Sequence, residues 1–351
     1  MFPVTVALCV VGGSPGRRTG RERVMRRFSL ALVAVGAFLV VLAPMIRFYA
    51  YPRLAVAPAN QISETGLQAK GATIFDAGTL KEIVTDLKIK VSTVGDAKAA
   101  KEHKGSVTYV NTTVTTDSAG TMTGPNGEVR GEIERMTFDA RTGEATPGIK
   151  DDFVSDTPGV EDKLVHKGLV AKFPFETQKK TYMFWDSTLL KAVPIKYLGT
   201  TKIEGMEVYK FGQTIPATQY DTMDAPRSIL GESGDGNVEA QMMYSVDRTL
   251  LVEPHTGVII KRTEAQNNTI DYQGTPRVTT TKAVVTYDDK TVRKNIDDYG
   301  SQGSMLNLVR NVVPQVGFVL GLVLMIGGVM MTRRQASSGG ARVKEREAVH
   351  A

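Results

Sequence analysis

The sequence has almost no cysteine. Cys9 is the only one in 351 residues, so no disulfide forms within the chain and no cysteine-based metal site exists. The histidines, His103, His166, His255 and His350, are far apart and form no metal-binding motif. We therefore predict neither a metal nor any other cofactor.

Motifs of catalysis and nucleotide binding are lacking as well. The chain contains no G-x-S-x-G, P-loop, G-x-G-x-x-G or H-E-x-x-H pattern. The acidic pairs Asp151-Asp152 and Asp288-Asp289 fall in predicted loops, where solvated charge is a simpler interpretation than a bound cation. We predict that the protein is not an enzyme, and we assign no catalytic residue.

An excess of positive charge is lacking from the middle of the chain, although the whole carries a formal net charge of +6. Residues 1–46 and 312–351 together hold 11 of the 43 bases but 3 of the 37 acids, which leaves residues 47–311 at −2. The net positive charge comes from the two terminal segments and gives no reason to expect nucleic-acid binding.

Two long uncharged runs are present, at residues 28–46 and 312–331. Each reaches the roughly 20 residues that a helix needs to cross a bilayer. The first run also resembles a signal peptide, but Pro44 directly after Ala43 should block cleavage there. We favour an uncleaved signal-anchor, and we expect translation to begin at Met25, directly before Arg26 and Arg27.

Arginines indicate the orientation of these predicted transmembrane helices. Six precede the first run and bases also follow the second, so the positive-inside rule places both termini in the cytoplasm. The prediction is a two-pass plasma-membrane protein. Its parts are a cytoplasmic segment (1–27), a transmembrane helix (28–46), an extracytoplasmic domain (47–311), a second transmembrane helix (312–331) and a cytoplasmic tail (332–351).

Glycines mark one face of the second predicted helix. Gly317, Gly321 and Gly328 fall within a narrow arc at 100° per residue, and small residues allow close helix contact. The alternative is that glycine is simply common in membrane helices. The partner of such a face would be the first helix, through Ala34 or Ala37, or another copy of the chain in a homo-oligomer.

Between the helices, alternation of apolar and polar residues predicts a mainly β domain with a large antiparallel sheet. Helical patterns are scarce: short helices are predicted at Ala77–Leu87 and Ala97–Lys104, and the polar segment Asp288–Asn311 is predicted to link the domain to the second transmembrane helix. The predicted strands are 88–94, 106–115, 132–139, 168–175, 181–185, 206–215, 238–246, 258–265 and 278–287.

Two turns have the same form, an acid followed by two residues and then Thr-Gly. They are Asp139–Gly143 and Glu253–Gly257, and each lies between predicted strands. An acid opens a type I turn by accepting backbone N–H bonds, and glycine supplies the positive φ that closes it. We predict a hairpin at each.

Large apolar side chains gather in one segment that holds the only tryptophan: Phe173, Phe175, Tyr182, Phe184 and Trp185. The simpler interpretation is the core of a sheet. The alternatives are a groove for an apolar ligand and a lip that faces the membrane.

The stretch from Gly168 to Asp186 and the stretch from Tyr244 to Ile259 resemble the actinobacterial family of unknown function DUF3068, also called the porin PorA family. The paired helices fit as well, so the resemblance covers about residues 28–331. The family's name implies a channel, which here would be built from helices of several copies. It implies no catalytic residue.

We predict from these features a cell-envelope protein whose β domain binds or handles an apolar ligand, with membrane lipid as its partner. The alternatives are a porin-like channel of oligomerised transmembrane helices and a structural or protein-interaction module of the envelope. Nucleic acid is not an expected partner.

Overall fold

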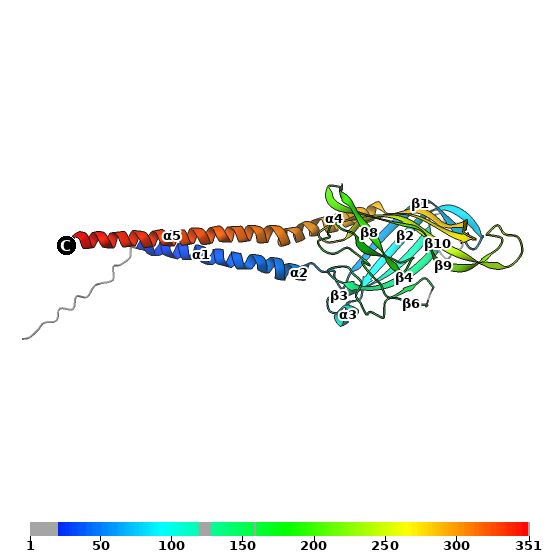
Figure 1. The fold of residues 1–351 in the computed structure, drawn as a ribbon, viewed down its shortest axis with the longest axis horizontal. Helices are drawn as coiled ribbons and strands as arrows, with labels where there is room; N and C mark the ends of the chain where they lie inside the picture. The colour runs from blue at the N-terminus through cyan, green and yellow to red at the C-terminus, as the bar shows by residue number, and fades with distance from the viewer. Residues whose placement is uncertain (1–19, 119–127, 158, 350–351) are drawn as a thin grey trace, which may run out of the picture. The chain divides into compact units, whose positions relative to one another are not determined.

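The computed structural model describes residues 20–118, 128–157 and 159–349 (Figure 1). Cys9 and the apolar residues around it lie outside the described residues. The chain divides into two compact units, Met1–Tyr51 with Leu308–Ala351, and Pro52–Asn307.

The first unit is helical. It comprises α1 (Gly20–Met45), the π-helical turns η1 (Ile46–Ala50) and η3 (Leu308–Val312), and α5 (Val313–Val349), with α2 (Tyr51–Leu54) at its boundary. The expectation of a long apolar helix near each end is confirmed. Pro44 lies inside α1 and lacks an N–H, and the helix widens into η1 directly after it.

The helices of this unit expose apolar side chains, as membrane-spanning helices do. Phe38 and Val41 on α1 and Val319 and Val323 on α5 are all well exposed. A helix satisfies its own backbone hydrogen bonds, so an apolar surface of this kind is stable in hydrocarbon.

The second unit is a sheet of twelve antiparallel strands among the described residues, in the order β6-β5-β4-β3-β2-β1-β12-β11-β10-β9-β8-β7. The chain enters at the middle of the sheet and leaves there, because β1 pairs with β12. The strands are β1 (Ile62–Asp76), β2 (Lys81–Gly95), β3 (Ser106–Asp117), β4 (Glu128–Asp139), β5 (Phe153–Ser155), β6 (Asp162–Lys163), β7 (Tyr182–Asp186), β8 (Lys191–Ile203), β9 (Met206–Pro226), β10 (Asn237–Val252), β11 (Ile259–Tyr272) and β12 (Thr275–Tyr287).

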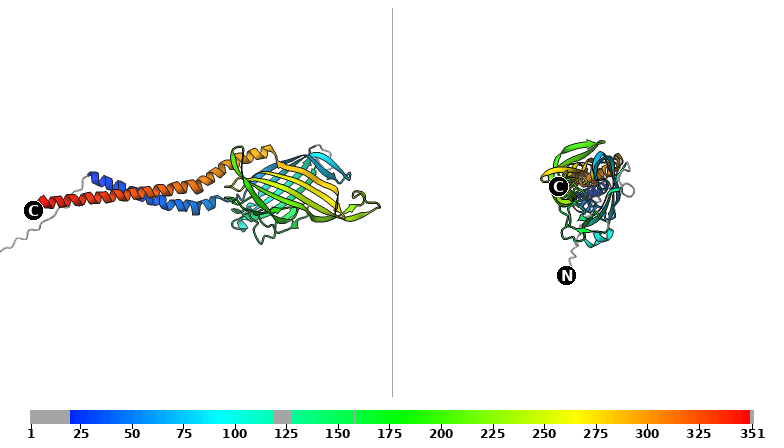
Figure 2. Two further views of the ribbon diagram at one scale, coloured as in Figure 1. Left: turned by 45° about the horizontal axis from the view of Figure 1, so that its top comes forward. Right: turned by 90° about the vertical axis from the view of Figure 1, so that its right-hand side faces the viewer.

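The sheet curls until β7, at one end, approaches β4 near the other end (Figures 1 and 2). Isolated bridges join Phe138 of β4 to Ala145, Glu144 to Leu169, and Leu169 to Phe184 of β7. The sheet is therefore an incomplete barrel with a distinct inner face.

Alternation along the strands decides which side chains reach that inner face. On β10, Tyr244, Val246, Leu250 and Val252 are buried and point inward, with Arg248 in the same phase. The expectation of a mainly antiparallel β domain is confirmed.

Two local predictions are wrong. Ala77–Leu87 is not helical: a turn precedes β2, where inward Leu87 continues the alternation of Ile89 and Val91 and the backbone pairs with β1 and β3. Residues 168–175 form no strand apart from the Leu169 bridges, because Phe173 N and Phe175 N donate to Gly257 O and Arg141 O in two turns instead of to a neighbouring strand.

The segment predicted as a polar linker, Asp288–Asn311, is helical and contains α4 (Asp289–Asn307). Asp288 accepts a hydrogen bond from Thr291 N at 2.7 Å and so caps the first turn. The predicted short helix is confirmed as α3 (Ala97–Glu102), capped in the same way by Asp96.

Candidate functional site

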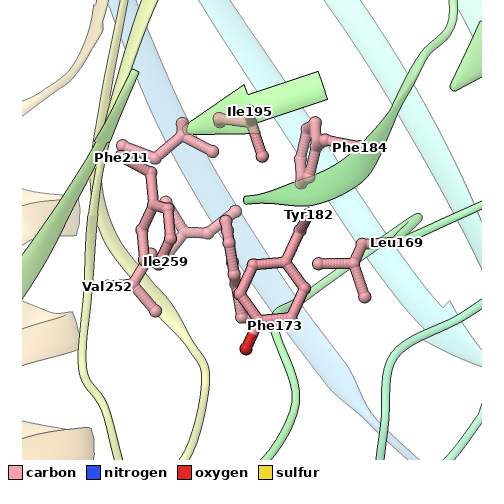
Figure 3. Packing of buried hydrophobic residues seen from close by; sticks show 9 residues of the cluster. Leu169, Phe173, Tyr182, Phe184, Ile195, Phe211, Val252 and Ile259 are labelled. Carbon is pink, nitrogen blue, oxygen red and sulfur yellow. The ribbon is translucent and has the colours of Figure 1, made fainter. Parts of the chain in front are cut away.

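The aromatic segment lies mostly in a packed core on the inner face. Phe173, Tyr182 and Phe184 are buried with Phe211 of β9 (Figure 3). The ring centroid of Phe173 lies 5.4 Å from that of Tyr182, 5.9 Å from Phe184 and 4.5 Å from Phe211. Rings at these distances are in contact, so these side chains fill the space between them. Trp185 is buried on the other side of β7, and Phe175 is half-buried.

The segment of residues 170–177, which we call the strap, crosses the inner face between the two acid-opened turns. Phe173 N donates to Gly257 O at 2.8 Å, and Phe175 N donates to Arg141 O at 3.0 Å. Both turns form the predicted hairpins, one leading from β4 into the bridge at Ala145 and the other joining β10 to β11. They also hold the strap in place.

Glycine is required in both turns for two reasons. Gly143 and Gly257 each have φ +73°, which favours glycine. A Cβ on Gly143 would lie 2.4 Å from Lys172 O, and a Cβ on Gly257 would lie 2.1 Å from Phe173 O. The strap therefore lies closer to Gly143 and Gly257 than a Cβ at either position would permit.

Lys172 of the strap is a buried amine. Its Nζ has no hydrogen-bond partner in the described part of the chain and lies 3.8 Å from the ring centre of Phe175. The carboxylates of Asp139 and Glu253 serve their own turns instead, by accepting from backbone N–H groups. Burial lowers the pKa of Lys172 to about 7.

Where the strap and β7 cover β9 and β10, the inner face also holds a buried ionic network. Arg248 donates to Glu264 of β11 through Nε and to Asp186 of β7 through Nη2 at 2.9 Å. Tyr244 donates to Asp186 at 3.1 Å. Burial alone would raise the pKa of Glu264, but the guanidinium groups of Arg262 and Arg248 outweigh it and lower that pKa to about 2.

A second polar group joins β4 to β7 at the incomplete closure of the barrel. His166 is buried between carboxylates, with Nδ1 3.1 Å from Asp152 and Nε2 3.0 Å from Glu134. Trp185 Nε1 also donates to Glu134, at 3.0 Å. Burial would lower the pKa of His166, but the hydrogen bonds to Asp152 and Glu134 outweigh it and raise the pKa.

The other half of the inner face, over β12, β1 and β2, presents apolar side chains that are only half-buried. Leu67 of β1 lies opposite both Tyr287 of β12 and Ile89 of β2, so these three form a row across the strands. We call the half-buried apolar side chains that pack on this half the inner stripe: Ile83, Ile89 and Val91 of β2, Val129 of β4 and Tyr287 of β12. They pack on a buried cluster that contains Leu67, Leu87 and Val285.

A cleft of about 590 Å³ lies beside the strap, and its lining is polar. Lys179 and Lys180 line it, and their ammonium groups each lie 5.1 Å from a tyrosine ring, those of Tyr209 and Tyr182 respectively. His255, at its rim, has Nδ1 3.3 Å from Glu176. These exposed cations suit an anion better than an apolar chain.

The acidic pairs have structural roles. Asp152 belongs to the His166 group, and Asp288 caps α4. Among the residues that the structure describes, no group of three or more histidine, cysteine or acidic side chains is arranged to hold a metal ion.

In the helical unit, two of the three named glycines face α1. A Cβ on Gly321 would lie 2.7 Å from Gly36 O, and a Cβ on Gly328 would lie 2.8 Å from Ser29 O. Gly317 has open space around it. The glycine on α1 that receives this contact is Gly36, between Ala34 and Ala37.

Sequence reasoning missed Arg248, Arg262, Glu264 and His166. The sequence does contain a signal for Arg248, which lies between Val246 and Leu250 in the inward-facing phase of the alternation along β10. A charged residue in the buried phase of a strand needs an ionic partner. For His166 no comparable signal exists, because its partners come from β4 and from a loop.

Fold and site together define a class of membrane protein, in which an apolar helix lies near each end of the chain and a curled antiparallel β domain lies between them. The chain belongs to the Porin PorA family, whose model matches residues 28–330.

Two relatives share this description. A protein named Porin PorA from Corynebacterium amycolatum is 26% identical over 298 residues, which cover 68% of this chain and 76% of the relative. A Porin PorA from Corynebacterium resistens is 22% identical in an alignment of 409 positions, gaps included, that covers 88% of this chain and 97% of that relative.

Proposed function

We propose that this protein is a two-pass envelope protein whose extracytoplasmic β domain binds an apolar ligand, such as a lipid, on the inner stripe. The observation that carries the proposal is the contrast between the two halves of the inner face. The strap and β7 cover one half, whereas Ile89, Val91 and Tyr287 on the other half remain half-buried. A concave apolar surface with a few polar groups beside it is typical of ligand sites.

The proposed topology puts this face where envelope lipids are abundant. The arginines before the first span and the bases after the second favour cytoplasmic termini, and the β domain then lies outside. Burial of an acyl chain contributes about 0.8 kcal/mol per CH₂. A chain of about 14 carbons would then reach micromolar affinity after the cost of association.

Native mass spectrometry of the full chain, released from maltoside micelles, tests the proposal. We expect lipid adducts on the wild type and fewer on a variant with Ile89→Thr and Val91→Thr, which removes apolar surface from the stripe. Val84→Thr is the matched control, because Val84 lies on the opposite face of β2 and is 73% exposed. A wild type that carries no lipid would refute ligand binding.

The family's name supports a second candidate, a channel formed by helices of several copies. The face of α5 that carries Gly321 and Gly328 already packs on α1. The exposed face that remains is apolar, with residues such as Val319 and Val323, and offers water little to bind. We expect purified full chain in planar bilayers to give no steps of conductance above protein-free controls; reproducible unitary steps would favour the channel.

A further inference from the structure

Arg262 stands where the covered half of the inner face meets the inner stripe. It lies opposite Leu250 of β10, and the pairing of Thr263 with Thr286 places it opposite Tyr287 of β12. Tyr287 packs against both the buried aromatic cluster that contains Phe173 and the buried cluster that contains Leu67. The Arg262 side chain is therefore beside the apolar row that continues to Leu67.

The guanidinium of Arg262 is only partly used. Its Nε donates to Glu264 Oε1 at 2.7 Å, and its two terminal nitrogens have no hydrogen-bond partner in the described part of the chain. The side chain is 36% exposed. Glu264 also accepts from Arg248 and from Gln266 Nε2, so its oxygens are already shared. The two terminal nitrogens of Arg262 are therefore available to donate to a ligand.

We propose that Arg262 anchors the anionic end of an amphiphile whose acyl chain lies along Tyr287, Leu67 and Ile89. This inference rests on the proposed function and names the ligand's polar end as a carboxylate or a phosphate. A guanidinium matches either group with two parallel N–H···O bonds, and such charge-assisted bonds are strong where water is partly excluded. Glu264 binds the Nε of the guanidinium, which leaves the two terminal nitrogens for the ligand.

Two probes with the same chain length separate the anchor from the stripe. We would titrate the full chain in maltoside with ¹³C-carboxyl palmitate and with hexadecanol, and read binding by NMR. Palmitate should bind the wild type about 10- to 100-fold more tightly, the factor expected for hydrogen bonds to a charged group. A 16-carbon lysophosphatidate in the same assay decides between carboxylate and phosphate.

The preference for the anion should disappear in Arg262→Gln while hexadecanol binding is unchanged, which also shows that the variant is folded. Arg262→Lys should keep part of the preference, and serves if the glutamine variant fails to fold. Arg277→Gln is the matched control, because Arg277 also pairs with a carboxylate, that of Glu232 at 3.1 Å, but lies at the opposite end of β12 from Tyr287.

Each outcome has one meaning. If the wild type binds palmitate and hexadecanol equally, the anchor is refuted and the proposed function stands. If it binds neither, the proposed function fails. If Lys179→Gln with Lys180→Gln removes the preference and Arg262→Gln does not, the anion is bound in the exposed cleft, and the assignment to Arg262 is wrong.

Discussion

The imidazole of His166 and the indole of Trp185 lie edge to face, with ring centroids 4.8 Å apart, and both rings bond to the carboxylate of Glu134. Because Trp185 is the only tryptophan, its fluorescence reports on this one group.

We first predict that Trp185 emission and the stability of the β domain depend on the charge of His166. The folded-state pKa of His166 is raised above 6.5. The stabilisation is therefore complete below about pH 6.5 and is lost as the pH rises through the folded value. An adjacent imidazolium quenches indole, so emission should increase over that range. His166→Gln should abolish the transition, and His255→Gln should preserve it; a transition unchanged in His166→Gln would contradict the assignment.

A second prediction concerns Glu264. Its pKa falls from 4.5 in the unfolded chain to about 2, so its stabilisation is complete above pH 4.5 and is lost as the pH falls towards 2. Glu264→Gln leaves Arg248 and Arg262 without their shared carboxylate and should lower the free energy of unfolding by about 3–5 kcal/mol at neutral pH. Urea unfolding followed by Trp185 fluorescence measures it.

The control for Glu264 is Glu232→Gln, which breaks an ion pair with Arg277 that lies at the surface. Exposed pairs contribute about 0–1 kcal/mol. Equal losses for the two variants would mean that burial of the Glu264 network is not what makes it stabilising.

Third, Gly257→Ala should destabilise the β domain more than Gly148→Ala. Both glycines have positive φ, +73° and +80°, so both variants incur backbone strain. Only at Gly257 does the new Cβ collide, at 2.1 Å from Phe173 O, whereas nothing lies within 4 Å at Gly148. We expect an additional loss of about 1–3 kcal/mol in urea unfolding. Equal losses would show that the strap moves away from the new Cβ without lowering the free energy of unfolding.

The fourth prediction tests the packing of α1 on α5. Cysteines introduced by Val33→Cys and Gly328→Cys, with Cys9→Ser, should crosslink on oxidation, because the Gly328 Cβ would lie 2.7 Å from a Val33 methyl group, although the helices must shift to admit this one atom. Gly321→Leu should reduce the yield severalfold by separating the helices. Gly317→Leu should leave it unchanged, since Gly317 has open space. Loss of yield in both variants would indicate a general effect of bulk.

Fifth, reporter fusions test the topology. A fusion at residue 340 should behave as cytoplasmic and a fusion at residue 235 as external, because the basic residues flank the spans on one side. Alkaline phosphatase and a fluorescent protein that matures only in the cytoplasm give opposite readouts. A cytoplasmic signal at residue 235 would overturn the proposed orientation.

Local pattern was sufficient for the helices near the two ends and for parts of most strands. Uncharged runs of 19 and 20 residues specify helices in hydrocarbon whatever surrounds them. Alternation specified the first half of β9 and part of β10, but it did not reveal β1 or β8. The two acid-opened turns were also readable, because the acid and the glycine act on backbone within five residues. The errors came where neighbours decide: Ala77–Leu87 has helix-forming residues, yet its latter part pairs with β1 and β3.

Only the tertiary structure decided what the inner face contains. Arg262 and Tyr287 are 25 residues apart and meet because β11 pairs with β12. His166 reaches Glu134 and Trp185 because the sheet curls until β4 approaches β7. From the sequence, the aromatic segment could be either a packed core or a ligand groove. It is a packed core because the strap is held over β9 and β10. Non-local pairing sets each of these contacts, and a linear pattern carries no record of which strands will be neighbours.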